Sequence, residues 1–186
     1  MRWDSLFGDL DAQWHAATQD ELERHITELA RIELSQASFS EHLRGALGEH
    51  VAVAMPTGDV HHGVLSRVEA DWLLLQADAR FLLIPLAKIV RIQGRGLQRR
   101  AQVARISYPL AAALRVLARN RAGVLVEHAS RETAAVRGVI DAVGADFVLI
   151  AQMADGVSRS GTNQQGNVMI PFQHMLTVMS SDENEL

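Results

Sequence analysis

The chain of 186 residues contains no cysteine, one lysine, four prolines and only 5% aromatic residues. Without cysteine there is no disulfide framework, no thiolate metal site and no thiol nucleophile. No apolar run approaches the roughly 18 residues that a membrane-spanning helix needs. The sequence opens with acidic amphipathic residues rather than a basic region followed by an apolar stretch, which argues against a signal peptide. We therefore expect a cytoplasmic protein with no membrane segment.

Charge is distributed unevenly along the chain. The net charge is −4, yet residues 88–121 carry nine cations and no acidic residue. A basic block between acidic flanks indicates either a polyanion site or a partner for the protein's own acidic surface. Under the first alternative, RNA phosphates would be contacted by Arg91, Arg95, Arg99, Arg100, Arg105, Arg115, Arg119 and Arg121. The scarcity of aromatic residues for base stacking in this region argues against that alternative.

The sequence contains an internal duplication. Gly63–Leu75 aligns without gaps onto Gly138–Ile150, with six of thirteen positions identical. Farther on, Ile84-Pro85-Leu86 followed by Ile89, Val90 and Ile92 matches Ile170-Pro171-Phe172 followed by Met175, Leu176 and Val178. The repeat period of about 75 residues is too long for a solenoid unit, so the pattern predicts two copies of one small domain.

Each copy carries the local signals of short antiparallel strands. In the first copy we predict strands over Val51–Met55, Val60–Val68, Asp71–Leu75, Phe81–Ile84 and Ile89–Ile92. A proline–glycine turn joins the first two, and Pro85 ends the fourth because proline cannot donate to a central ladder. A helical segment precedes each copy, and a helix followed by five short, bent strands is typical of a small closed barrel.

The glycine-led second strand, the Asp-aromatic-x-Leu pattern of the third and the closing strand pair resemble the Sm-like small β-barrel family. The chain looks most like an actinobacterial-type protein with two Sm-like barrels. The resemblance implies assembly into rings through the fourth and fifth strands, and RNA binding on the ring faces. The uracil-binding Asn of the family is replaced by Leu73 and Val148. Its Arg-Gly or Lys-His motif is replaced by Ile84-Pro85-Leu86 and Ile170-Pro171-Phe172.

The expected fold is mostly β with N-terminal helices, and it consists of two Sm-like five-stranded barrels in tandem, each preceded by a helix. The expected organisation is a helical segment over 1–37, a first barrel over 38–94, an Arg-rich linker over 95–106, a second barrel over 107–180 and an acidic tail over 181–186.

The N-terminal segment is amphipathic. One apolar stripe consists of Trp3, Leu6, Phe7, Leu10 and Trp14, and a second predicted helix carries Leu22, Ile26, Leu29 and Ile32. Two alternatives remain open at this point. The helices either pack on the barrels or present the first stripe to a protein partner, since aromatic anchors serve cores and interfaces alike.

Candidate chemistry is sparse. No nucleophile-elbow, phosphate-loop, dinucleotide or zinc-protease motif occurs. His61 and His62 should point to opposite faces of a strand, with His62 pairing near Val53 and His50 out of register, so we expect solvated histidines and no metal site. Asp71 and Asp146 are expected to cap turn amides. We therefore expect no enzyme and no cofactor, but a scaffold that self-associates through barrel edges and docks a partner, with RNA binding as the alternative.

Overall fold

The computed structural model describes residues 37–97, 107–130, 135–153 and 164–181, together with His25, Thr27, Glu28, Arg31, Ile32 and Ser35. The chain divides into two compact units, Met1–Ser38 and Phe39–Leu186. In the first unit, the six residues named singly are helical and exposed, which agrees with the helix predicted there. The second unit contains the duplicated sequence. We call residues 39–97 the first half and residues 107–181 the second half.

The two halves have the same order of elements, a leading helix followed by five strands. The first half consists of α2 (Phe39–Leu43), a 3-10 turn (Arg44–Ala46), β1 (His50–Ala54), β2 (Val60–Val68), β3 (Trp72–Ala77), β4 (Arg80–Pro85), a second 3-10 turn (Leu86–Lys88) and β5 (Arg91–Gly94). The second half consists of α3 (Leu110–Arg119), β6 (Gly123–His128), β7 (Ala135–Val143), β8 (Phe147–Met153), β9 (Gln164–Pro171), a 3-10 turn (Phe172–His174) and β10 (Met175–Ser181). The predicted strands of the first copy are present, with ends that differ by a few residues.

The strands form one antiparallel sheet of ten, in the order β5-β1-β2-β3-β4-β10-β6-β7-β8-β9. The prediction of two closed five-stranded barrels is therefore wrong. Closing each half would require its fourth strand to pair with its own fifth strand, but β4 pairs with β10 of the other half. Among the described residues, β5 pairs only with β1 and β9 only with β8, so the sheet is open at both ends.

The two halves share a close strand contact at a glycine and a bulge in the second strand. A Cβ atom at Gly63 would lie 2.5 Å from the carbonyl oxygen of Gln76, and one at Gly138 would lie 2.2 Å from that of Ala151. Only glycine permits this close approach of two strands. The ladder register also shifts between Leu65 and Arg67 in β2 and at the equivalent place in β7. A bulge there bends the long second strand of each half.

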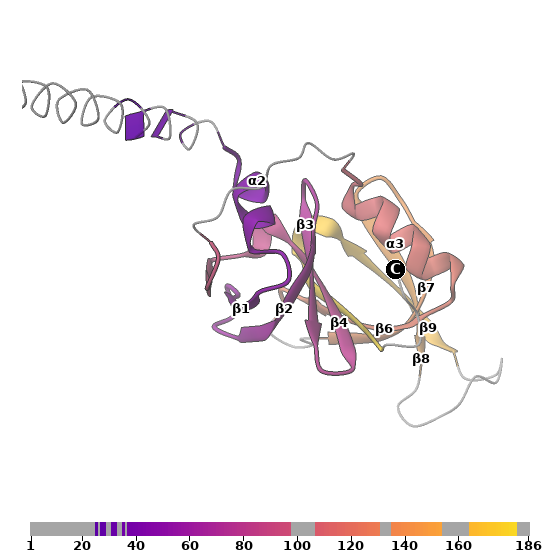
Figure 1. Ribbon diagram of the computed structural model, residues 1–186. Coiled ribbons are helices and arrows are strands. Elements are labelled where there is room, and N and C mark those ends of the chain that lie inside the picture. The colour runs from indigo at the N-terminus through magenta and orange to yellow at the C-terminus, as the bar shows by residue number, and fades with distance from the viewer. Residues whose placement is uncertain are drawn as a thin grey trace, which may run out of the picture. The chain divides into compact units, whose positions relative to one another are not determined.

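Helix α3 covers the second half beside β7 (Figure 1). Its buried side chains are Leu110, Ala113, Leu114 and Leu117, which follow the spacing of one helical face. In the first half the leading helix is much shorter, because α2 passes directly into a 3-10 turn. The buried residues Leu43, at the end of α2, and Ala46, in the 3-10 turn, have the same spacing of three residues as Leu114 and Leu117. If Leu43 and Ala46 are matched with Leu114 and Leu117, Phe39 of α2 is the counterpart of Leu110 of α3.

Candidate functional site at the sheet edges

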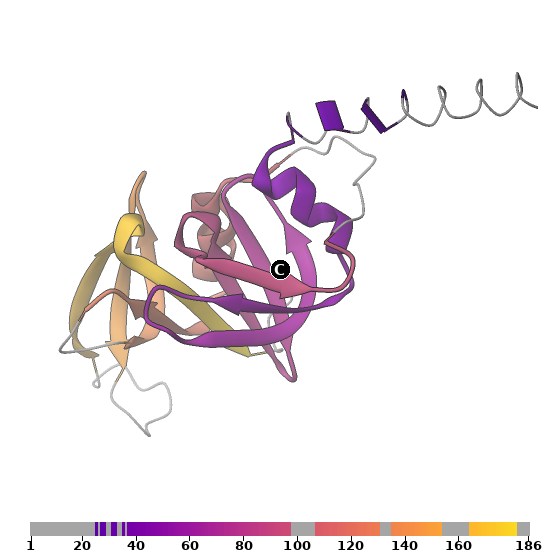
Figure 2. The same cartoon turned by 90° about the vertical axis from the view of Figure 1, so that its left-hand side faces the viewer.

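The strongest structural feature is the junction at which the two halves share one sheet. Strand β10 pairs with β4 of the first half on one side and with β6 of its own half on the other (Figure 2). The β4–β10 register runs from Leu83 opposite Val178 to Arg80 opposite Ser181. The backbone groups of β4 that would otherwise be unpaired are thus satisfied by the other half of the chain.

Side chains of both halves meet on either side of this junction. One hydrophobic cluster belongs mainly to the second half but includes Trp72, Leu74 and Leu83 of the first. The other cluster belongs mainly to the first half but includes Leu176 of the second. Since each core contains residues of the other half, the two halves stabilise each other through buried apolar contact.

The turn between β2 and β3 holds the start of α3. The residue before this helix is Pro109, whose side chain cannot cap it. Instead, both carboxylate oxygens of Asp71 accept the Leu110 backbone N–H, each at 3.1 Å. The indole Nε1 of Trp72 donates to the Tyr108 carbonyl at 2.9 Å. Asp71 therefore caps a helix of the other half, and the expectation that it caps its own turn is corrected.

Glu69 is the buried centre of the same contact. It is 6% exposed and accepts hydrogen bonds from Arg67 Nε at 2.7 Å, Ser107 Oγ at 2.9 Å and the Tyr108 backbone N–H at 3.0 Å. The Arg67 guanidinium also lies over the rings of Trp72 and Tyr108, 5.8 and 5.7 Å from their centroids. Burial by itself raises the pKa of Glu69, but these hydrogen bonds and the charge of Arg67 together hold that pKa below its ordinary value.

We expect Glu69→Gln to lower the free energy of unfolding at neutral pH by about 1–3 kcal/mol, because the amide cannot accept from three donors as the carboxylate does. A folded-state pKa below the ordinary value of 4.5 means that the carboxylate stabilises the fold fully above that pH and loses this effect as the pH falls. Urea unfolding at several pH values should therefore show the difference between wild type and variant shrinking in acid. The control is Asp78→Asn, an exposed carboxylate in the β3–β4 turn, which should change stability little. A stability loss for Glu69→Gln that is the same at every pH would contradict the ionised role of Glu69.

Further polar contacts join the halves. Thr177 Oγ1 donates to Glu127 Oε2 at 2.6 Å, and His61 Nε2 of the first half lies 3.9 Å from that same oxygen. The His61 Nε2 atom is buried and has no hydrogen-bond partner among the described residues. In addition, Lys88 Nζ donates to the Gln173 carbonyl. The expectation that His61 is a solvated hairpin residue is thus wrong.

The two open edges of the sheet carry the counterparts of the residues buried at the junction. Met169 precedes Ile170-Pro171 as Leu83 precedes Ile84-Pro85, yet Leu83 is 1% exposed and Met169 is 59% exposed. Val90 corresponds to Leu176 in the same way, and it is 67% exposed where Leu176 is 5% exposed. Met169 on β9 and Val90, directly before β5, are therefore exposed where the equivalent residues of the other half are buried.

The predicted RNA-contacting arginines are spread over several elements. Arg91 and Arg95 are exposed at and after β5, and Arg115 and Arg119 are exposed on α3. None of these four forms an ion pair with another described residue; Arg115 donates to the Gly144 carbonyl at 3.2 Å. Arg121 is also exposed, just after α3. Arg99, Arg100 and Arg105 lie outside the described residues, so RNA binding by this block stays a prediction.

The other predicted site residues are placed as follows. His62 is exposed and pairs with Ala52, the neighbour of Val53, and His61 pairs with Val53 itself. No group of three or more His, Asp or Glu side chains within the described ranges could hold a metal ion. The predicted docking residues Trp3, Leu6, Phe7, Leu10 and Trp14 lie outside the described residues.

Sequence reasoning missed Glu69 and the roles of Met169 and Val90. A signal for the edge residues was present, because the repeat alignment already matches Val90 with Leu176. For Glu69 the signal was a difference between copies, since Gly144 takes its place in the second half. What was lacking was the knowledge of which edges are paired within the chain.

No protein-family model matches the chain, and the comparison with curated proteins gives no match. Within the part of the chain that the structure describes, no helix has both the length and the apolar character needed to cross a membrane.

Proposed function

We propose that this protein is a non-catalytic scaffold that self-associates head to tail, by pairing β9 of one copy with β5 of the next. The observation that carries the proposal is the difference in exposure between equivalent residues. Leu83 and Leu176 are buried at the β4–β10 junction, whereas their counterparts Met169 and Val90 lie exposed on the open edges. An exposed edge with apolar side chains favours pairing with another chain.

The duplication also supplies the register of the proposed contact. Since Leu83 lies opposite Val178 at the internal junction, Met169 would lie opposite Ile92 of the next copy. One step along, Val168 would lie opposite Gln93, and Asn167 opposite Gly94. This pairing uses different surfaces on the two partners, and such heterologous contacts close into a ring or continue as a filament.

The leading helices favour the same arrangement. Leu110 is 5% exposed and belongs to the cluster that includes Trp72 of the first half. The counterpart of Leu110 is Phe39, which is 50% exposed, and the counterpart of Trp72 is Phe147, which is partly exposed. In the proposed contact, Phe39 of one copy would pack near Phe147 of the next. Three exposed apolar residues of one chain thus find matching positions in a second copy.

The resemblance to the Sm-like family supports a closed assembly, because that resemblance implies rings built through fourth and fifth strands. A ring of about three chains would place six halves around one axis.

The second part of the proposal is that the stripe of Trp3, Leu6, Phe7, Leu10 and Trp14 docks a protein partner. A scaffold of this kind would present several copies of that stripe at once, which increases the strength of binding to a multivalent partner.

The proposal is tested by measuring the mass of the full chain in solution, by light scattering and native mass spectrometry over a range of micromolar concentrations. We expect multiples of the 20.4 kDa chain, with one fixed multiple if the ring closes and a mass that grows with concentration if it does not. A mass of one chain at every concentration would overturn the proposal.

A further inference from the structure

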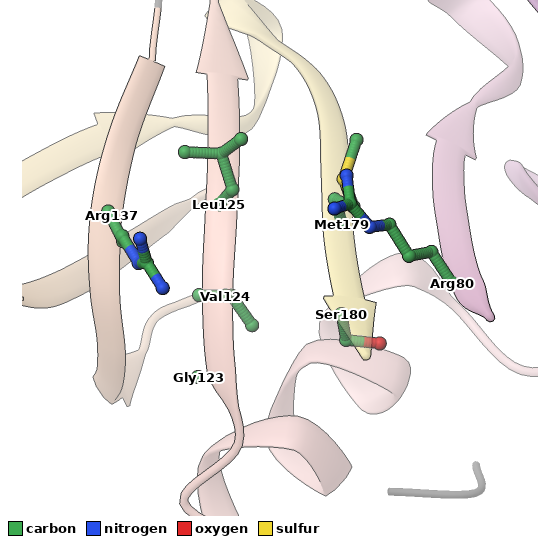
Figure 3. Close-up of a pocket in the computed structure, with 7 residues that line it drawn as sticks. All are labelled: Arg80, Gly123, Val124, Leu125, Arg137, Met179 and Ser180. Carbon is green, nitrogen blue, oxygen red and sulfur yellow. The ribbon is translucent and has the colours of Figure 1, made fainter. Parts of the chain in front are cut away.

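A second surface feature lies within one chain, beside the β4–β10 junction. It is a hollow of about 350 Å³ lined by Arg80, Gly123, Val124, Leu125, Arg137, Met179 and Ser180 (Figure 3). Its floor is formed by the neighbouring strands β6 and β10, whose residues Leu125 and Met179 lie opposite each other. Its volume falls at the lower end of the range for small-ligand sites.

Two arginines flank this floor. Arg137 of β7 lies opposite Leu125, and Arg80 is two residues before Leu82, which lies opposite Met179. Directly opposed residues of a sheet share a face, as do residues two apart on a strand. The register therefore places both arginine side chains on the face that carries Leu125 and Met179. Figure 3 shows the two side chains on either side of β6 and β10.

Among the described residues, no acidic group compensates the charge of this hollow. Neither Arg80 nor Arg137 forms an ion pair with another described residue, and the described residues that line the hollow include no Asp or Glu. Within the described part of the chain, Arg80 makes one weak hydrogen bond, from Nη1 to Met179 Sδ at 3.7 Å. Both arginines are exposed, and most of their N–H donors have no partner among the described residues.

The fold itself does not require these arginines. In the repeat, the counterpart of Arg80 is Gly166 and the counterpart of Arg137 is His62. The same strand arrangement is thus built in the other copy without a guanidinium at either position. The arginine pair is a property of this one hollow rather than of the duplicated fold.

We propose that the hollow binds a small organic phosphate. Two guanidinium groups match the charge of a phosphate monoester dianion better than that of a single carboxylate, and each can donate two parallel hydrogen bonds to it. Leu125, Val124 and Met179 provide apolar contact for the organic part of the ligand. The described residues that line the hollow include no aromatic side chain, which disfavours a stacked nucleobase of single-stranded RNA.

Isothermal titration calorimetry of the full chain at low ionic strength tests this site, with phenyl phosphate, inorganic phosphate and benzoate as probes. We expect phenyl phosphate to bind more tightly than inorganic phosphate, because only the former contacts the apolar floor, and more tightly than benzoate. Arg80→Gln and Arg137→Gln should each weaken phenyl phosphate binding about tenfold or more. Arg95→Gln, which replaces an exposed arginine after β5, is the matched control and should leave binding unchanged.

Absence of phenyl phosphate binding by the wild-type chain would overturn the assignment, as would unchanged binding by both hollow variants. Benzoate binding as tightly as phenyl phosphate would overturn the choice of phosphate, and tighter binding of an oligouridylate would overturn the choice of a small ligand. Both arginines are exposed, so we expect folded variants, and circular dichroism checks this. Because the hollow is contained in one chain, its test does not depend on self-association.

Discussion

Met169→Asp and Val90→Asp are each expected to reduce the assembly to single chains, and an equimolar mixture of the two variants is expected to form dimers and nothing larger. Each contact in the proposed assembly needs one intact β9 edge and one intact β5 edge. The Met169→Asp chain keeps only its β5 edge, and the Val90→Asp chain keeps only its β9 edge. Neither variant can pair with itself, but one intact edge of each remains complementary to the other.

The expected effect is large because each substitution places an unpaired carboxylate in a contact that the equivalent residues of the chain bury almost completely. Leaving a charge buried without a partner costs about 3–5 kcal/mol, which weakens association more than a hundredfold. Native mass spectrometry with one variant isotopically labelled identifies the mixed dimer directly.

Val60→Asp is the matched control for these edge variants. Val60 is 44% exposed, but it pairs with Ala54 of β1 and belongs to neither open edge of the sheet. It should leave the assembly unchanged. If Met169→Asp or Val90→Asp alone still forms the wild-type assembly, the chains associate through another surface. A mixture that restores assemblies larger than a dimer would also contradict head-to-tail pairing of these edges.

Leu83→Ala is expected to lower the free energy of unfolding by about 2–5 kcal/mol, whereas Met169→Ala is expected to change it by less than about 0.5 kcal/mol in the single chain. The two residues occupy equivalent positions in the repeat, directly before Ile-Pro. Leu83 is packed among side chains of both halves, so its truncation leaves a cavity in the core of the molecule. Truncation of Met169 removes no such packing, because its side chain is mostly exposed.

Urea unfolding of both variants provides the measurement, in the Val90→Asp background so that β9–β5 pairing does not contribute. Equal losses in the free energy of unfolding for Leu83→Ala and Met169→Ala would contradict the difference in burial between these two equivalent positions. In the wild-type background, the destabilisation by Met169→Ala should grow with protein concentration, because stability then includes the energy of association.

Much of the local structure could be predicted from the sequence. The alignment of Gly63 with Gly138 located two glycines that permit close strand contact, and the predicted β2 over Val60–Val68 agrees with the observed strand. These features are readable because they depend on nearby residues: a glycine at a crowded position, a proline that ends a strand, and alternation of apolar side chains.

The assembly of the strands was not predictable in the same way. A fourth strand can satisfy its outer backbone groups with its own fifth strand, with that of the other copy or with another chain, and its sequence is compatible with all three. The sequence therefore suggested closed barrels, and the structure shows β4 paired with β10 instead. For the same reason, Glu69 was not predicted as a site residue and His61 was wrongly expected to be solvated. Both residues contact side chains or backbone of the other half.

The sequence by itself determined that the chain is duplicated, that each copy consists of a leading helix and five short strands, and that charge and apolar residues are unevenly placed. The tertiary structure alone decided which edges are joined and which are open, and it brought Arg80 and Arg137 to one hollow. The physical reason is that strand formation follows from local residue pattern, whereas strand pairing and the meeting of distant side chains depend on hydrogen bonds and packing between segments far apart in the chain.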